Sequence, residues 1–100
     1  MNIQITSRKF RAKDSLKLFI SDEIKSLERF NDQIREANVI LSFMHQKDSI
    51  KTAEINLKLP GKTLSVNETS DDFFKSVTSA SGKLARQLKK IKTKKISKKR

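Results

Sequence analysis

Apolar side chains recur at alternating steps of three and four between residues 70 and 91, the spacing of one face of an α-helix. This face comprises Phe74, Val77, Ala80 or Ser81, Leu84, Leu88 and Ile91. A helix turns by about 100° per residue, so the opposite side collects Lys75, Ser79, Gly82, Lys83, Arg86, Lys89 and Lys90. We expect Ser70 to cap this helix, and Asp71 and Asp72 to complement its dipole. The pattern predicts a long amphipathic helix with a core-facing side and a basic outer side.

The chain before residue 70 shows two further hydrophobic patterns. Helical spacing predicts another helix over 14–30, with an apolar stripe formed by Leu16, Phe19, Ile20, Ile24, Leu27 and Phe30. Leu18, Lys25 and Arg29 point away from this stripe. Alternation of apolar and polar residues predicts half-buried strands, which we place at 2–7, 37–44, 50–59 and 62–67, with a polar turn at 45–49. The order of elements is therefore β-α-β-β-β-α.

A proline–glycine pair at 60–61 predicts a tight turn, because proline fixes φ and glycine tolerates a positive φ. A hairpin closed by this turn pairs Leu57 with Leu64. The next inward-facing pair is Ile55 with Val66. Both pairs lie on one face of the sheet, and a slip of one residue would expose half of them to water.

The sequence predicts an α+β fold with two layers. A sheet with one apolar face and two helices with one apolar stripe each are satisfied when both helices pack on that face. The first two strands are joined through a helix and should be parallel, and the hairpins are antiparallel, which gives a four-stranded mixed sheet. We expect a cleft between the helices lined by Lys25, Arg29, Lys75, Lys83 and Arg86.

The net charge of +12 is concentrated at one end of the sequence. Residues 1–72 hold 12 lysines and arginines against 11 acids, and residues 73–100 hold 11 and none. Such segregation on a folded helix indicates a polyanionic partner. A membrane surface is disfavoured because the sheet needs the helix's apolar face. We place one binding domain at 1–92 and a basic, disordered tail at 93–100, which has too little apolar content to pack.

The composition argues against an enzyme. The single histidine, His45, lies in a predicted turn without an evident nucleophile beside it, and Gly61 and Gly82 are the only glycines, so there is no phosphate-binding glycine loop. Asp71 and Asp72 are more simply explained by the helix dipole than by a metal. We expect no cofactor and no metal. The absence of cysteine, of a signal sequence and of a long apolar run predicts a cytoplasmic protein.

The basic helix suits RNA recognised by shape, since duplex RNA is contacted mainly at phosphates and 2′-hydroxyls. There is no Trp or Tyr, and most of the six phenylalanines fall on predicted core faces, so we expect backbone rather than base recognition. Ser79 and Gly82 would let a phosphate backbone approach closely. Alternatively, Gly82 only weakens the helix by about 1 kcal/mol.

At this point five segments together resemble the ribosome hibernation promoting factor family, which includes the ribosome-associated inhibitor and the sigma modulation proteins. The segments are NIQITSR, KSLERF, ANVILS, NLKLPGKTL and DDFFKSVTSASGKLARQLKK. The resemblance spans residues 1 to about 92, and implies the fold above. It also implies binding to the small ribosomal subunit between head and body, across the channel for messenger and transfer RNA, which blocks translation and preserves idle ribosomes in stationary phase or stress.

The resemblance also suggests residues for this contact. Basic positions of the family's last helix correspond to Lys83, Arg86 and Lys89 or Lys90, and those near its first helix correspond to Arg8 and Arg29. Together with the basic residues beside them, the predicted RNA-binding set is Arg8, Lys9, Lys25, Arg29, Lys75, Lys83, Arg86, Lys89 and Lys90.

The chain also departs from the family pattern. Glu23 and Ser26 stand where basic residues are usual, and Ala85 replaces a common acid, so charge shifts to the last helix. We expect no second domain, so that the chain resembles the short form of the family. A short form needs a separate partner to form ribosome dimers, or opposes dimerisation. We expect a monomer when free, without DNA or membrane partners.

Three alternatives remain open. The α-β-β-β-α portion matches the topology of a double-stranded-RNA-binding module, although such modules place lysines where Ser70, Asp71 and Asp72 open this helix. A protein-interaction module that modulates a transcription factor would predict weak salt dependence. An RNA-processing enzyme is the third, and it would depend on His45.

Overall fold

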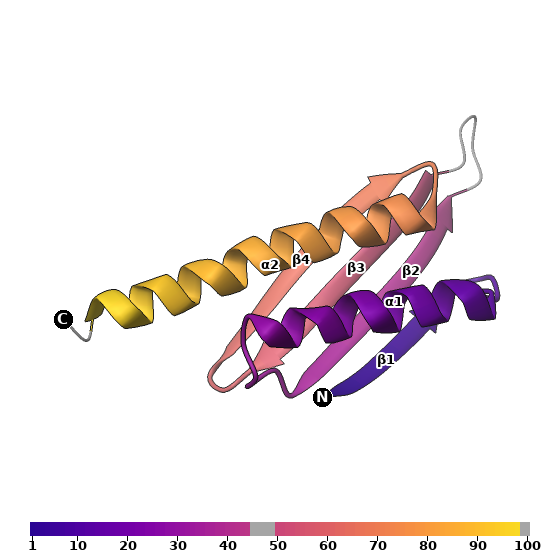
Figure 1. Ribbon diagram of the computed structural model, residues 1–100. Coiled ribbons are helices and arrows are strands. Elements are labelled where there is room, and N and C mark those ends of the chain that lie inside the picture. The colour runs from indigo at the N-terminus through magenta and orange to yellow at the C-terminus, as the bar shows by residue number, and fades with distance from the viewer. Residues whose placement is uncertain (45–49, 99–100) are drawn as a thin grey trace.

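The computed structural model describes residues 1–44 and 50–98, with side chains as far as Ile91. The predicted turn at 45–49, with His45, lies outside the described residues. One sheet and two main helices make up the fold (Figure 1), and α1 continues into a short 3₁₀ helix, η1. The bounds are β1 Asn2–Ser7, α1 Asp14–Ser26, η1 Leu27–Arg29, β2 Glu36–Met44, β3 Ile50–Leu59, β4 Lys62–Ser70 and α2 Phe73–Lys98.

The predicted sheet topology is confirmed. The strand order is β1-β2-β3-β4, with β1 parallel to β2 and the other two pairs antiparallel. Both helices cover the same face, and α2 lies over β3 and β4 (Figure 1). The hairpin register is also as predicted, because Leu57 pairs with Leu64 and Ile55 with Val66. The two-layer arrangement follows from the alternation of apolar residues in these strands.

The core lies between the sheet and the helices. Its fully buried side chains alternate along β2 and β3 and recur along α1 and α2, and they include Val39, Leu41, Ile55, Leu57, Ile20, Ile24, Val77, Leu84 and Leu88. Leu18, predicted to point away from the stripe of α1, is 67% exposed. These residues hold the two helices at fixed positions on the sheet.

The start of α2 differs from the prediction. Strand β4 continues to Ser70, which still pairs with Lys51 of β3, so Ser70 does not cap the helix. The cap is Asp72 instead, because its Oδ1 accepts a hydrogen bond from the Phe74 N–H at 3.0 Å. The Ser70 hydroxyl accepts from the Asp72 N–H at 3.1 Å and thereby shapes the turn into the helix.

The phase of α2 also differs at its first turn. Phe73 is only 8% exposed and belongs to the core, whereas Phe74, which we placed on the core face, is 40% exposed. Phe73 and Phe74 lie four and three residues before Val77, so helical spacing allows either of them on the core face. The side of α2 that packs on the sheet determines which one is buried. Ser76 is fully buried, and its hydroxyl donates to the Lys51 carbonyl oxygen at 2.8 Å. A polar residue at a core position gives no hydrophobic signal, so its burial cannot be predicted from the pattern.

The ends of both helices differ from the predicted bounds. The α-helical part of the first helix stops at Ser26, and its last turn tightens into η1 before Phe30. The backbone of α2 continues to Lys98, beyond residue 92 where we ended the binding domain. No side chain after Ile91 is described, and the division into a domain at 1–92 and a disordered tail at 93–100 stays a prediction.

Substitutions at the two glycines test how backbone conformation contributes to stability. Gly61 has φ of +72°, and a Cβ added there would meet nothing within 4 Å. Gly61→Ala should therefore destabilise the fold by about 1–2 kcal/mol through left-handed strain alone. Gly82→Ala is the matched control, because Gly82 is helical with equally open space, and it should stabilise by about 1 kcal/mol. Urea denaturation measures both, and shifts of the same sign would contradict this account.

Candidate nucleic-acid interface

Every side chain of the predicted RNA-binding set is exposed to solvent. The set falls into three places. Arg8 and Lys9 follow β1, Lys25 and Arg29 lie at the end of the first helix, and the other members, Lys75, Lys83, Arg86, Lys89 and Lys90, lie along α2. The structure therefore presents all of them to a partner without assembling them into one cluster.

The outer side of α2 forms the longest basic surface, which we call the α2 basic face: Lys75, Arg86 and Lys90. At 1.5 Å per residue, the helix carries these charges over about 22 Å. Ser79 and Gly82 lie between them and are exposed, so no bulky side chain interrupts the face. The apolar side of the helix is buried in the core, which holds α2 in place on the sheet. The α2 basic face is thus a rigid row of cations.

The predicted cleft between the helices is wrong for Lys83. Its Nζ lies 2.6 Å from Glu68 Oε2 of β4, which places Lys83 on the side of α2 turned away from α1. Lys89, which we left out of the cleft, faces the first helix instead. Its Nζ lies 5.1 Å from the centroid of the Phe30 ring, a cation–π arrangement. The periodicity placed both lysines on the outer half of α2, and only the position of the sheet edge separated them.

Lys25 also lies away from α2. The residues of the first helix that meet α2 include Phe19. The centroid of its ring lies 5.1 Å from that of the Phe74 ring. Lys25 comes six positions after Phe19 and is turned by about 120° around the helix. It therefore points outward and does not line the space between the helices.

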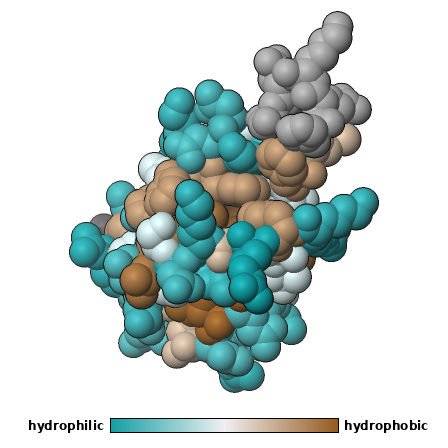
Figure 2. Space-filling view, turned by 90° about the vertical axis from the view of Figure 1, so that its right-hand side faces the viewer, coloured by the Kyte–Doolittle hydropathy of each residue, from teal (hydrophilic) through white to brown (hydrophobic). Residues whose placement is uncertain are grey.

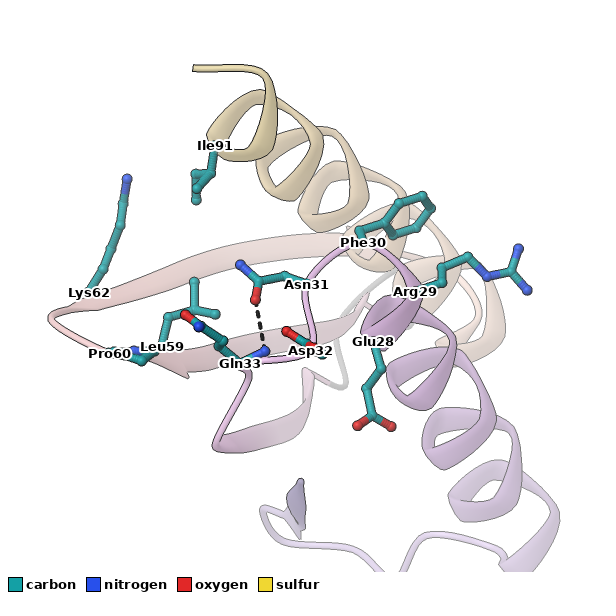
Figure 3. Close-up of a pocket in the computed structure, with 10 residues that line it drawn as sticks. All are labelled: Glu28, Arg29, Phe30, Asn31, Asp32, Gln33, Leu59, Pro60, Lys62 and Ile91. Atoms are coloured by element: carbon teal, nitrogen blue, oxygen red, sulfur yellow. Dashed lines mark hydrogen bonds between the residues drawn. The ribbon is translucent and has the colours of Figure 1, made fainter. Parts of the chain in front are cut away.

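Arg29 borders a hollow of about 610 Å³ beside η1. Figure 3 shows Arg29 and Lys62 on opposite sides of this hollow, which is closed by the loop after η1, the β3–β4 turn and Ile91. The Gln33 N–H donates to Asn31 Oδ1 at 2.8 Å and holds the loop. Glu28 and Asp32 also line the hollow and offset its two cations. It is therefore mixed in charge, unlike the α2 basic face.

The ion pair of Lys75 does not remove it from the interface. Its Nζ lies 3.5 Å from Asp71 Oδ1, and both side chains are largely exposed. Exposed pairs of this kind contribute only about 0–1 kcal/mol, so a phosphate can replace the carboxylate. Asp71 is thus a weak partner of Lys75, and Asp72 is the helix cap, which accounts for both acids without a metal.

Three cations near the start of α2 were missed by the sequence analysis: Arg11, Lys13 and Lys51. Arg11 and Lys13 belong to the connection before α1, and Lys51 to β3. They lie around one small pocket with Asp72. No sequence pattern links these residues, because Lys51 in β3 is distant in the chain from Arg11 and Lys13.

The opposite face of the sheet is polar and close to neutral. Its side chains form hydrogen-bonded pairs across the strands, as between Ser65 and Asn56 at 2.6 Å. Lys58 Nζ lies 3.1 Å from Glu36 Oε2, and this hydrogen bond lowers the pKa of Glu36 below its usual value. The excess positive charge therefore belongs to the helix side of the molecule.

The chain resembles known proteins over nearly its whole length. Residues 3–96 match the family described as Sigma 54 modulation protein / S30EA ribosomal protein. The ribosome hibernation promotion factor of Deinococcus radiodurans is 27% identical over 90% of this chain, which spans only 48% of that relative. The ribosome hibernation promoting factor of Azotobacter vinelandii is 29% identical over 96% of this chain and 87% of its own length.

A solved structure agrees with the fold. A ribosomal subunit interface protein from Coxiella burnetii superposes with a TM-score of 0.82 and 29% identity, over 93% of this chain and 99% of that one. Within the described residues, no helix is long and apolar enough to span a membrane.

Proposed function

This chain belongs to the Sigma 54 modulation protein / S30EA ribosomal protein family, and we propose that it binds the small ribosomal subunit in the channel for messenger and transfer RNA. Its relatives are ribosome hibernation factors rather than enzymes. The protein would act in the cytoplasm on idle ribosomes, in stationary phase or stress. By occupying the channel it would block translation and preserve the ribosome.

The α2 basic face is the observation that carries this proposal. Its cations are exposed on one side of one helix, and no acid follows residue 72 in the sequence. Ribosomal RNA presents phosphates at its surface, and lysine and arginine on a fixed surface bind them without reading sequence. The neutral outer sheet gives the molecule one attractive side, so the helices would face the RNA.

We rank the cations of α2, both those of the α2 basic face and Lys83 beside it, by the ion pair that each would have to give up. Arg86 and Lys90 have no ion pair in the part of the chain whose side chains are described, and they are the first to meet phosphate. Lys75 would exchange its weak, exposed ion pair with Asp71 for a contact with phosphate. Lys83 must leave Glu68, a half-exposed and well-formed pair, so its gain from RNA is smaller. The mechanism is steric occlusion of the channel combined with electrostatic anchoring.

Co-sedimentation on sucrose gradients tests this proposal. The wild-type protein is expected to travel with purified small subunits and with whole ribosomes. Small subunits already loaded with messenger and transfer RNA should retain much less of it, because the ligands compete for the channel. Binding to large subunits alone, or equal binding to loaded and empty small subunits, would contradict the proposed site.

The same gradients address the dimer question and the duplex alternative. An increase or a loss of ribosome dimers on adding the protein shows whether it promotes or opposes dimerisation. A free-standing duplex-RNA module would bind a short RNA duplex as tightly as it binds the small subunit. Since Asp71 and Asp72 stand at the start of α2, where such modules use lysines, we expect the subunit to bind far more tightly.

A further inference from the structure

A pocket of about 280 Å³ opens where both helices begin, at the end of the molecule away from the hollow beside η1. It is formed by the connection before α1, the first turn of α1, the start of β3 and the start of α2. Figure 2 looks onto this end and shows hydrophobic surface bordered by hydrophilic side chains. The pocket is separate from Arg86 and Lys90 of the α2 basic face.

Aromatic rings form the floor and one wall of this pocket. Phe10 and Phe73 stack almost in parallel, with ring centroids 5.1 Å apart and planes 11° apart. Phe73 is nearly buried, and its packing holds the stacked pair in place. Phe74 is 40% exposed, and its ring packs against the Phe19 ring with an angle of 57° between the ring planes. The exposed ring is therefore oriented by packing, which favours stacking with a flat ligand.

The rim of the pocket is positively charged. Arg11, Lys13 and Lys51 line it, and Lys51 Nζ is held there by donating to the Asp71 carbonyl oxygen at 3.3 Å. Among the described residues of the lining, Asp72 is the one acid, and its carboxylate accepts the N–H of Phe74. Aromatic rings beside an excess of cations favour a ligand that combines a flat ring with flanking anions.

We propose that this pocket binds an unpaired base of single-stranded RNA, which stacks on Phe74 while its neighbouring phosphates meet Arg11, Lys13 and Lys51. Single-stranded RNA offers free base faces and phosphates on either side of each base, and aromatic side chains recognise it by stacking. Duplex RNA cannot enter in this way, because its bases are stacked inside the helix. The pocket thus adds base recognition to a protein whose α2 basic face meets only phosphates.

Fluorescence of a single tryptophan tests the stacking directly. The chain has no Trp, so Phe74→Trp places one indole at the wall of the pocket. A single-stranded RNA of ten nucleotides should quench its emission, and a duplex of the same length should not. Leu18→Trp is the matched control, on an exposed site of α1 outside the pocket, and its emission should not change with either RNA. Quenching that is equal for the two RNAs at position 74 would overturn the proposal.

Affinity measured by fluorescence anisotropy of the labelled RNA gives an independent result. Phe74→Ala should weaken single-stranded binding by about tenfold and leave duplex binding and the salt slope unchanged. Arg11→Ala should lower the slope against salt by about 1 unit. Leu18→Ala should change none of these quantities, and circular dichroism confirms the fold of each variant. If Phe74→Ala binds single strands as the wild type does, the pocket is not a base site.

These assays use RNA free of ribosomes, so their outcome is independent of the proposed channel. Loss of ribosome binding by Phe74→Ala with unchanged affinity for single strands would indicate a protein contact at the pocket, and would also overturn the proposal. Loss of both would support it.

Discussion

Arg86→Glu combined with Lys90→Glu is expected to weaken binding to the small ribosomal subunit by about a hundredfold or more at 0.1 M salt. Each side chain would lose a charge-assisted contact worth about 1.5–3 kcal/mol and would then repel the phosphate it had met. Both residues are exposed and lie outside the core, so the fold should be kept. Binding to fluorescent small subunits, titrated at several salt concentrations, measures the effect.

The salt dependence separates electrostatics from other losses. If about six cations meet phosphates, the logarithm of the association constant should fall with the logarithm of salt at a slope of about −4 to −5. The double variant should flatten this slope by nearly 2 units. A wild-type slope near zero would contradict electrostatic anchoring and would favour a protein partner.

A matched control carries the same change in net charge on the sheet side. Arg35→Glu combined with Lys58→Glu alters exposed cations of the loop before β2 and of β3. Since Lys58→Glu also breaks the pair with Glu36, circular dichroism first checks that this variant is folded. Its affinity should fall only a fewfold, through the weaker long-range attraction of the whole molecule. Equal losses in the two double variants would mean that net charge, rather than the α2 basic face, determines binding.

Leu84→Ala is expected to destabilise the protein by about 2–5 kcal/mol. Leu84 is fully buried in the middle of α2, between the helix and the sheet. Truncation removes apolar contacts and leaves a cavity that the surrounding core fills only in part. Domains of this size are stable by only about 5–15 kcal/mol, so the loss is a large share of the total. Equilibrium unfolding in urea, followed by circular dichroism, measures it.

Leu18→Ala is the control for this result, because the same substitution at an exposed site of α1 should change stability by no more than about 0.5 kcal/mol. The two variants also connect the core to the interface. Leu84→Ala should lower ribosome binding only under conditions in which it unfolds, since Leu84 touches no partner. A large loss for Leu18→Ala, or none for Leu84→Ala, would contradict the core described here.

The sequence by itself determined the architecture. Strand alternation and the proline–glycine turn at 60–61 predicted the pairing of Leu57 with Leu64, because a slip of one residue would turn an apolar face to water. Helical spacing predicted both helices and their common sheet face. The concentration of lysines after residue 72 predicted a basic outer side on the last helix. All of these patterns are local, and the apolar ones have a single arrangement that buries their residues.

The tertiary structure decided how the side chains at the margins of α2 are used. Phe73 lies four residues before Val77 and Phe74 lies three, and both spacings fit the apolar face of a helix. Phe73 is the buried one because its side of α2 faces the sheet. Lys83 and Lys89 both lie on the outer half of the helix. The edge strand β4 brought Glu68 to Lys83, and the first helix brought Phe30 to Lys89.

The pocket at the start of the helices was likewise beyond sequence reasoning. Arg11 and Lys51 are far apart in the chain, and they share a rim with Phe74 only because β3 and both helices begin at the same end of the molecule. Periodicity reports which side of one element is apolar. The neighbours that the remaining sides contact depend on how the elements pack together, and only the tertiary structure shows this.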